Sequence, residues 1–187
     1  MVKKVLIAYG SRYGSCKDVA DELANILTTE GLQADVWDLK NKKIPSSPLD
    51  SYDGFIIGSG IKINKWTKEA ENLLKDYNGV AKSDAVLGIF VCCGKALDEK
   101  EESVKQYIEK YIDMYGLDPK IYDSFGPSFD LTKDSKVGFL GKKMLKGIAK
   151  EMGKKQGVEV KDGEKYDFRD WDKIREFAQE YKKHVTG

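Results

Sequence analysis

The sequence has few of the residues on which most catalytic and metal sites depend. Its 187 residues include one histidine, His184, and three cysteines, Cys16, Cys92 and Cys93. A lone histidine near the end of the chain argues against histidine-based catalysis and histidine-rich metal sites. Three cysteines, an odd number without the regular spacing of disulfide-rich domains, argue against a disulfide scaffold and favour a reducing, cytoplasmic location. With no acid–base pair or nucleophile triad apparent either, we expect no catalytic side chain and no metal.

Long hydrophobic runs and a strong net charge are also absent. No apolar stretch approaches the roughly 18 residues of a membrane span, and the apolar start, residues 5–8, meets Gly10 too soon for a signal peptide. The formal net charge is +1, and no basic patch is interleaved with aromatic residues, so we expect no nucleic-acid partner. The length fits a single domain, residues 1–187, large enough to bury both faces of a sheet.

The sequence does contain a regular alternation of short apolar runs and helical patterns. The predicted strands are residues 5–8, 34–39, 55–57, 86–91 and 120–122. The predicted helices are residues 19–27 ended by Gly31, 70–77 ended by Asn78-Gly79, 104–115 and 170–181. This order predicts an α/β fold, an open parallel sheet with helices on both faces. Ligands bind such sheets at the carboxyl ends of the strands, so the loops after the first, third and fourth strands are predicted to line a site.

The first of these loops, residues 10–16, combines two glycines with two serines at the start of a helix. Unpaired N–H groups and the positive end of the helix dipole favour an anion there, and the hydroxyls of Ser11 and Ser15 can donate to phosphate oxygens. The loop is neither a Walker A loop nor Gly-x-Gly-x-x-Gly, so a terminal phosphate is favoured over a dinucleotide. The alternative is a simple helix start, with Ser15 or Cys16 as the cap after a tight turn.

This loop resembles the FMN phosphate loop of flavodoxins, usually Ser/Thr-x-Thr-Gly-x-Thr. Ser11, Gly14 and Ser15 fit that pattern, whereas Tyr13 and Cys16 stand where it prefers threonine. The resemblance implies that backbone amides hold most of the phosphate and that the tyrosine covers the ribityl phosphate.

The order of elements over roughly residues 3–125 agrees with the same family. The resemblance therefore implies a flavodoxin-like three-layer fold, with a five-stranded parallel sheet in the order 2-1-3-4-5. It also implies FMN as a non-covalent cofactor. The first loop would then contribute the cofactor-binding residues Ser11, Arg12, Tyr13, Gly14, Ser15 and Cys16.

The second loop is expected to hold one side of the isoalloxazine ring. Its expected site residues are Ser59, Gly60, Ile61, Lys62 and Trp66. By resemblance Trp66 stacks on the ring, with Ile61 or Ile63 as apolar contacts; the alternative is a hydrophobic staple for the helix opening at Thr67. A glycine peptide at residue 60 can also turn its carbonyl toward the flavin cheaply, although it could be an ordinary turn glycine.

The third loop is expected to contact the other side of the ring through backbone groups. Its expected site residues are Cys92, Cys93, Gly94 and Lys95. Two small buried thiols at a strand end are the favoured interpretation of the cysteine pair, with a redox or metal role as the alternative. Flavodoxins usually carry a stacking tyrosine here, and none occurs between residues 92 and 100. We therefore expect a more open flavin on this face.

The charges in these loops are basic, unlike those of typical acidic flavodoxins. Arg12, Lys62, Lys65 and Lys95 lie in them. Cations near the ring stabilise an anionic reduced flavin by about 1 kcal/mol per exposed charge. The sequence therefore predicts a less negative potential than in acidic relatives.

About 40 residues are inserted before the last helix, at about residues 127–160. Residues 137–152 predict a basic amphipathic helix, which could make peripheral contact with an anionic membrane or dock an acidic partner. The favoured alternative is that its apolar face packs on the sheet or beside the flavin. The extension and the closing helix also resemble, more loosely, menaquinone-dependent protoporphyrinogen dehydrogenases.

The resemblance implies an electron carrier that shuttles one or two electrons between redox enzymes. Its partners would be redox proteins, a ferredoxin-like donor or a reductase, with the chain acting as a monomer or homodimer. The alternative is an FMN-dependent oxidoreductase of the protoporphyrinogen dehydrogenase or quinone reductase type. A third class is a flavin-binding module without turnover.

Overall fold

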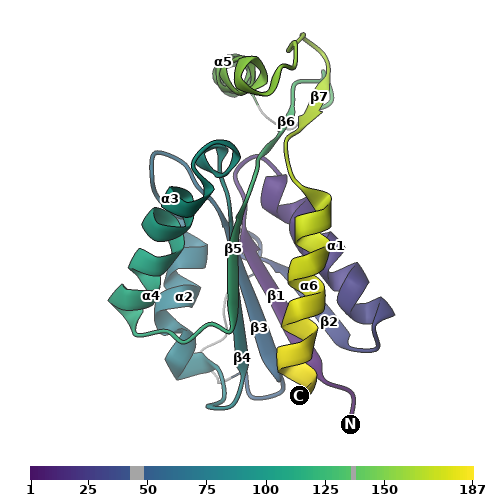
Figure 1. Ribbon diagram of the computed structural model, residues 1–187, viewed down its shortest axis with the longest axis vertical. Helices are drawn as coiled ribbons and strands as arrows, with labels where there is room; N and C mark the ends of the chain where they lie inside the picture. The colour runs from purple at the N-terminus through teal and green to yellow at the C-terminus, as the bar shows by residue number, and fades with distance from the viewer. Residues whose placement is uncertain (43–48, 136–137) are drawn as a thin grey trace.

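The computed structural model describes residues 1–42, 49–135 and 138–187, and its centre is a parallel sheet (Figure 1). The strands are β1 (Lys4–Gly10), β2 (Gln33–Asp38), β3 (Gly54–Gly60), β4 (Val86–Cys92) and β5 (Ile121–Phe125). They lie in the order β2-β1-β3-β4-β5 and every neighbouring pair is parallel. The predicted flavodoxin-like topology is confirmed.

Helices cover both faces of this sheet (Figure 1). On one face α1 (Ser15–Thr29) packs against α6 (Trp171–Thr186). On the other face lie α2 (Lys68–Val80), α3 (Lys100–Val104), a π-helical turn (Lys105–Glu109) and α4 (Lys110–Tyr115). A 3₁₀ turn, η1 (Gly94–Leu97), links β4 to α3. The result is the three-layer arrangement that the sequence predicts.

The alternation of side chains along β1 explains the two cores. Val5 and Ile7 belong to the cluster under α1 and α6, while Leu6 and Ala8 belong to the cluster under α2 and α4. All four are fully buried, because successive side chains of a strand point to opposite faces. Burying a valine, leucine or isoleucine side chain such as those of Val5, Leu6 and Ile7 contributes roughly 1.5–3 kcal/mol. The two apolar layers hold the strand ends, and hence the loops, in place.

Two details of the helix boundaries differ from the sequence predictions. Asn78-Gly79 does not end α2, which continues to Val80; the carbonyl of Val80 accepts the N–H of Leu49 at 2.7 Å. That hydrogen bond helps to keep the last turn helical, although glycine at residue 79 destabilises a helix by about 1 kcal/mol relative to alanine. α1 does start at Ser15, but its cap residue is Gly14 and no side chain caps it.

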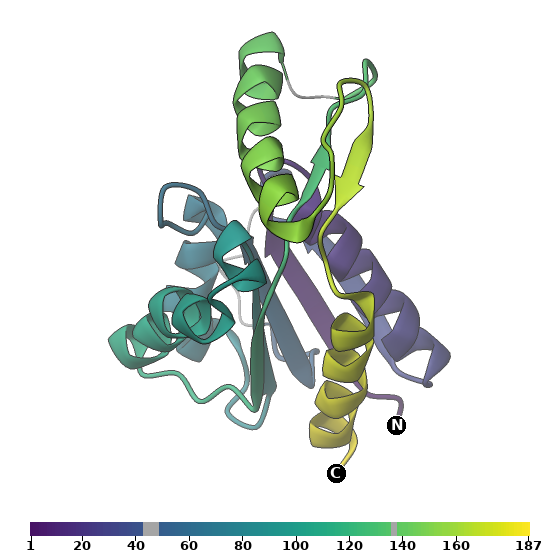
Figure 2. The same cartoon turned by 45° about the horizontal axis from the view of Figure 1, so that its top comes forward.

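The inserted unit contains the expected helix and a small sheet that the sequence did not predict. Its elements are β6 (Ser128–Asp130), α5 (Phe139–Gln156) and β7 (Lys165–Asp167), with β6 and β7 antiparallel. The predicted helix spanned residues 137–152, and residue 137 lies outside the described residues. The unit stands beyond the carboxyl ends of the parallel strands (Figure 2). None of the described helices is both long and apolar enough to cross a membrane.

Candidate functional site

A cavity of about 250 Å³ lies at the carboxyl ends of the strands, between the three predicted loops and the inserted unit. The predicted site residues that line it are Ser11, Arg12, Tyr13, Ser15, Gly60, Ile61, Lys62, Cys92, Cys93 and Gly94. The inserted unit adds Pro127, Ser128, Phe129, Met144, Leu145, Ile148 and Met152. Chain segments far apart in sequence therefore meet around one mainly apolar space.

The loop after β1 presents unused backbone donors at one end of this cavity. Gly14 adopts a φ of 98°, which favours glycine, and its N–H donates to the Ser11 hydroxyl at 3.0 Å. The N–H groups of Arg12, Tyr13, Ser15 and Cys16 find no acceptor among the described residues. The last two begin α1, so they add the positive end of a helix dipole. This arrangement can bind an anion such as a phosphate.

Gly10 is required by packing rather than by ligand geometry. A Cβ added there would lie 1.8 Å from the Thr67 hydroxyl oxygen, so only glycine lets β1 approach the start of α2. Gly60 differs, because an added Cβ would be 3.7 Å from Cys16 Sγ, an ordinary contact. Packing does not demand a glycine at residue 60.

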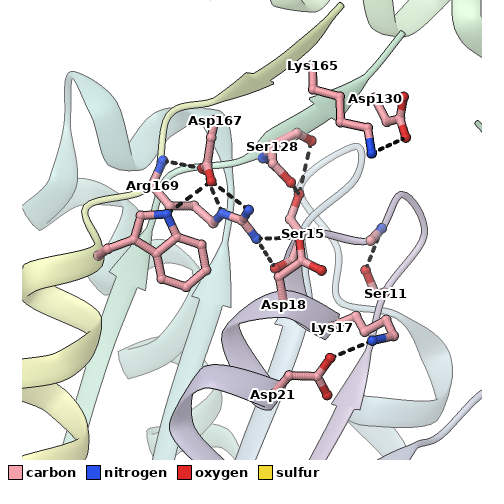
Figure 3. Close-up of polar contacts among 12 residues, drawn as sticks. Ser11, Ser15, Lys17, Asp18, Asp21, Ser128, Asp130, Lys165, Asp167 and Arg169 are labelled. Atoms are coloured by element: carbon pink, nitrogen blue, oxygen red, sulfur yellow. Dashed lines mark hydrogen bonds and ion pairs between the residues drawn. The ribbon is translucent and has the colours of Figure 1, made fainter. Parts of the chain in front are cut away.

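The side chain of Ser15 is tied to the inserted unit (Figure 3). Its hydroxyl oxygen accepts the N–H of Ser128 at 2.9 Å and donates to the carbonyl of the same residue at 3.2 Å. Both functions of the hydroxyl are thus used inside the protein. What Ser15 leaves free for a ligand is its backbone N–H rather than the hydroxyl that the sequence suggested.

Arg169 is a central residue of this region that the sequence analysis missed (Figure 3). Its side chain is only 5% exposed. It donates to both carboxylate oxygens of Asp167 at 2.7 Å, to Asp18 at 3.0 Å and to the Ser15 carbonyl at 2.9 Å. Burial alone would raise the pKa of Asp167, but the hydrogen bonds from Arg169 outweigh burial and lower it. The acidic neighbours Asp167 and Asp170 were the only local signal of its role.

The loop after β3 is a tight turn with two strained residues. Lys62 and Lys65 exchange backbone hydrogen bonds of 3.0 and 3.1 Å around Ile63 and Asn64, whose φ angles are 50° and 56°. Positive φ is unusual for a β-branched residue and often marks a functional position. The Ile63 side chain is 82% exposed and lines the cavity. The Tyr107 hydroxyl donates to Asn64 at 2.6 Å and holds the turn.

Trp66 is placed in the core and does not line the cavity. It is 2% exposed, its Nε1 donates to the Tyr107 carbonyl at 2.7 Å, and its ring lies 5.5 Å from that of Tyr111. Ser59 is also buried behind the cavity wall, where its hydroxyl accepts the N–H of Thr67 at 2.9 Å. The apolar residues that this loop brings to the cavity are Ile61 and Ile63, the two expected as apolar contacts of the ring.

The loop after β4 contributes thiols and a close backbone contact. Burial raises the pKa of the Cys92 thiol, and that of the Cys93 thiol as well, so both are uncharged at neutral pH and poor nucleophiles. The end of the Met152 side chain lies against Gly94, where an added Cβ would be 2.0 Å from its methyl carbon, a contact that this flexible side chain could relieve by moving. Lys95 points elsewhere and donates to Gln106 at 2.9 Å.

The charge at the cavity comes from two cations. Arg12 and Lys62 line it, and Lys62 Nζ donates to the Tyr13 hydroxyl at 2.8 Å. The same ammonium lies 5.3 Å from the centre of the Tyr13 ring. Lys62 therefore joins the first and second loops while keeping a positive charge at the cavity.

The apolar face of α5 serves the inserted unit and the cavity. Leu145 and Ala149 are buried against Phe129 and Tyr166 in the unit's own core. Met144, Ile148 and Met152 line the cavity. The helix thus packs beside the candidate site rather than on the sheet.

Comparison with known proteins agrees with this architecture. A family model described as a flavodoxin domain matches residues 6–182. None of the curated proteins matches the sequence.

Three solved structures illustrate the likeness of fold. Oxidised flavodoxin 1 from Bacillus cereus is 15% identical, with a TM-score of 0.60 over 97% of this chain and 99% of that chain. A short-chain flavodoxin associated with a non-canonical PDU bacterial microcompartment is 11% identical, with a TM-score of 0.61 over 99% of each chain. The rubredoxin oxygen:oxidoreductase from Desulfovibrio gigas is 16% identical, with a TM-score of 0.52 over 98% of this chain and 37% of that one.

At these identities the solved structures establish the fold alone. The family match extends over nearly the whole chain, from β1 to α6, and it therefore establishes the family. The chain belongs to the flavodoxin domain family and is a flavodoxin-like flavoprotein.

Proposed function

We propose that the protein binds one FMN in the cavity and carries electrons between redox enzymes. The observation that carries this proposal is the combination of unused N–H donors at one end with apolar walls along the rest. A phosphate suits the donors at the start of α1, and a planar ring system suits walls formed by Ile61, Ile63 and the Cys92–Gly94 segment. The cofactor would supply the redox chemistry, and the chain would supply position and charge.

The chain's residues have distinct roles in this proposal. The backbone N–H groups of Arg12, Tyr13, Ser15 and Cys16 bind the phosphate, and the guanidinium of Arg12 adds charge. The peptide between Gly60 and Ile61 lies beside the cavity. Its N–H donates to the Cys92 carbonyl at 3.0 Å and its carbonyl accepts the Ser59 hydroxyl at 3.3 Å, so turning that carbonyl toward the ring would break both hydrogen bonds. The roof formed by α5 excludes water from the inner part of the cavity.

The outer face of α5 is suited to bind a redox protein with an acidic surface. The helix carries six lysines and one glutamate on a chain of net charge +1. Lys143, Lys150 and Lys154 are exposed and have no ion-pair partner among the described residues. Leu145 and Ala149 of α5 are buried in the unit's core, and Ile148 and Met152 are half-buried. Among the side chains of α5 that the structure describes, only Met144, 40% exposed, remains as a large exposed apolar group for insertion into a lipid surface. We therefore propose docking of an acidic protein, in the cytoplasm, over membrane contact.

A second candidate function is favoured by the roof of the cavity. The flexible methionines Met144 and Met152 and the apolar side chain of Ile148 lie beside the proposed ring site. A small planar apolar substrate, a quinone or a porphyrinogen, could bind between them and the flavin. The protein would then be an FMN-dependent oxidoreductase.

An anaerobic redox titration of the purified full chain, followed by absorbance, tests the proposal. We expect flavin bands, FMN as the released cofactor, and reduction in two separable one-electron steps for a carrier. A single two-electron step with turnover of a quinone would favour the oxidoreductase instead. A colourless protein that takes up no added FMN would contradict both functions.

A further inference from the structure

The inserted unit is attached at both of its ends to the same turn of α1 (Figure 3). At its incoming end, Ser128 exchanges hydrogen bonds of 2.9 and 3.2 Å with the Ser15 hydroxyl. At its outgoing end, Arg169 donates to the Ser15 carbonyl at 2.9 Å and to Asp18 at 3.0 Å. The turn thus held carries two of the unused N–H donors, those of Ser15 and Cys16.

Arg169 connects three groups that no smaller side chain could reach together. Its Nε and one terminal nitrogen bind Asp167, the last residue of β7, while the other terminal nitrogen binds the α1 turn. These are charge-assisted hydrogen bonds on a side chain that is 5% exposed, where such bonds are strong. A guanidinium offers this fork geometry and an ammonium does not.

The connection continues from β7 to the roof of the cavity. β7 pairs with β6, and Phe129 of β6 and Tyr166 of β7 pack in one small core with Leu145 and Ala149 of α5. Arg169 and the two strands therefore form a continuous series of contacts between the α1 turn and α5. Packed elements of this kind move as units rather than deforming continuously.

We propose that Arg169 is a positioning residue that couples anion binding at the loop after β1 to closure of α5 over the cavity. The proposal rests on FMN being the ligand of this cavity. Phosphate binding fixes the N–H groups of Ser15 and Cys16. Arg169 joins the Ser15 carbonyl to Asp167 of β7. The fixed turn therefore holds β6, β7 and α5 in the closed position. By linkage, closure of α5 strengthens phosphate binding to the same extent.

The charge of Arg169 has a separate effect that the test must exclude. Asp18 lies in the first turn of α1 and would repel a bound phosphate if it were not paired with Arg169. Arg169→Lys keeps the positive charge near Asp18 but cannot bind Asp18, Asp167 and the Ser15 carbonyl at once. Arg175→Lys is the matched control, because Arg175 of α6 forms ion pairs with Asp172 and with Glu22 of α1 and makes no hydrogen bond or ion pair to the described residues of the inserted unit.

The experiment is hydrogen exchange of the α5 amides in full-length wild type and both variants, without flavin and saturated with FMN. We expect FMN to slow exchange in α5 about tenfold in wild type and in Arg175→Lys. In Arg169→Lys we expect a slowing of less than about threefold, although FMN is bound. A merely structural role would speed exchange across the sheet but leave the effect of FMN on α5 unchanged.

Equal slowing of α5 in all three proteins would overturn the coupling while leaving FMN binding intact. Absence of FMN uptake by wild type would overturn the proposed function, and the coupling with it. Asp18→Ala provides a milder variant if Arg169→Lys does not fold, since it removes the side-chain acceptor through which Arg169 binds α1, at a half-exposed position. It should reduce the slowing in part, and an unchanged slowing would count against the proposal.

Discussion

Lys62 is the side chain through which the protein most directly sets the charge at the cavity. It lines the cavity and bonds Tyr13 on the neighbouring loop. A cation there favours an anionic reduced flavin over the neutral oxidised one. The potential of the protein should therefore depend on this residue.

Lys62→Glu should lower the two-electron midpoint potential of the FMN-loaded protein. The change removes one positive charge and adds one negative charge, each worth about 1 kcal/mol at a partly exposed position. For a two-electron couple this corresponds to a shift on the order of 40 mV toward negative values. Spectroelectrochemistry measures it, with Lys75→Glu on the exposed side of α2 as the control. Equal potentials in the two variants would contradict the electrostatic account.

The residue scale also shows where sequence reasoning reached the site and where it did not. The small-residue pattern of residues 10–16 marked the donor loop, because helix starts with unpaired N–H groups follow from local sequence. It did not reveal that the Ser15 hydroxyl is bound to Ser128, since that contact joins residues 113 positions apart. Trp66 was predicted to line the cavity because of its position in the loop, but its burial depends on Tyr107 and Tyr111, which are distant in sequence.

At the scale of elements, Asp53 joins three segments at the amino-terminal edge of the sheet. Its carboxylate accepts the backbone N–H of Lys4 at 2.8 Å and binds Lys82 Nζ at 2.8 Å. The hydrogen bond from Lys82, followed by that from Lys4, lowers the pKa of Asp53 to about 2. The start of β3 is thereby tied to β1 and to the turn before β4.

Asp53→Asn should destabilise the protein at pH 7 and should do so less as the pH falls. Because folding lowers the pKa of this carboxyl, its contribution is complete above its unfolded pKa of about 3.9 and is lost toward pH 2. The group is near the surface, so we expect a loss of about 1 kcal/mol. Urea unfolding of both proteins at several pH values measures it. If the free energies of unfolding of wild type and Asp53→Asn differed as much at pH 2 as at pH 7, the ionised Asp53 carboxylate would not be the source of the stability.

The same scale separates the predictable elements from the missed ones. β1, β3 and β4 are apolar runs, and each was found because burial on both faces leaves a strong signal. β2 was found from its alternation, and β5 was predicted at residues 120–122 although it spans Ile121–Phe125. β6 and β7 have three residues each, which is too short for a pattern to be recognised. They exist because Phe129 and Tyr166 pack against α5, a tertiary reason that no local pattern contains.

At the scale of the whole molecule, the inserted unit places a basic face beside the proposed flavin site. The electrostatic attraction of this basic face should raise the association rate with an acidic partner, and added salt should weaken that attraction. The exposed lysines of α5 that lack a described partner are the residues to test.

Combined substitution of Lys143, Lys150 and Lys154 by glutamate should slow electron exchange with an acidic protein. We expect the second-order rate with an acidic [2Fe–2S] ferredoxin to fall at least about tenfold at low salt and to approach the wild-type rate near 1 M salt. Stopped-flow absorbance measures it. Lys68, Lys75 and Lys110, exposed on α2 and α4, provide an equal charge change as the control. Equal rates in both triple variants, or binding of wild type to anionic vesicles alone, would contradict the docking proposal.

The most direct test of the whole account compares the affinities of FMN and riboflavin for the flavin-free protein. If the N–H groups of residues 12–16 bind the phosphate, FMN should bind at least about a hundredfold more tightly, because each charge-assisted hydrogen bond contributes roughly 1.5–3 kcal/mol. Fluorescence titration measures both dissociation constants under the same conditions. A preference for FMN of this size is the result that the account predicts. Equal affinities for the two flavins would contradict the central claim.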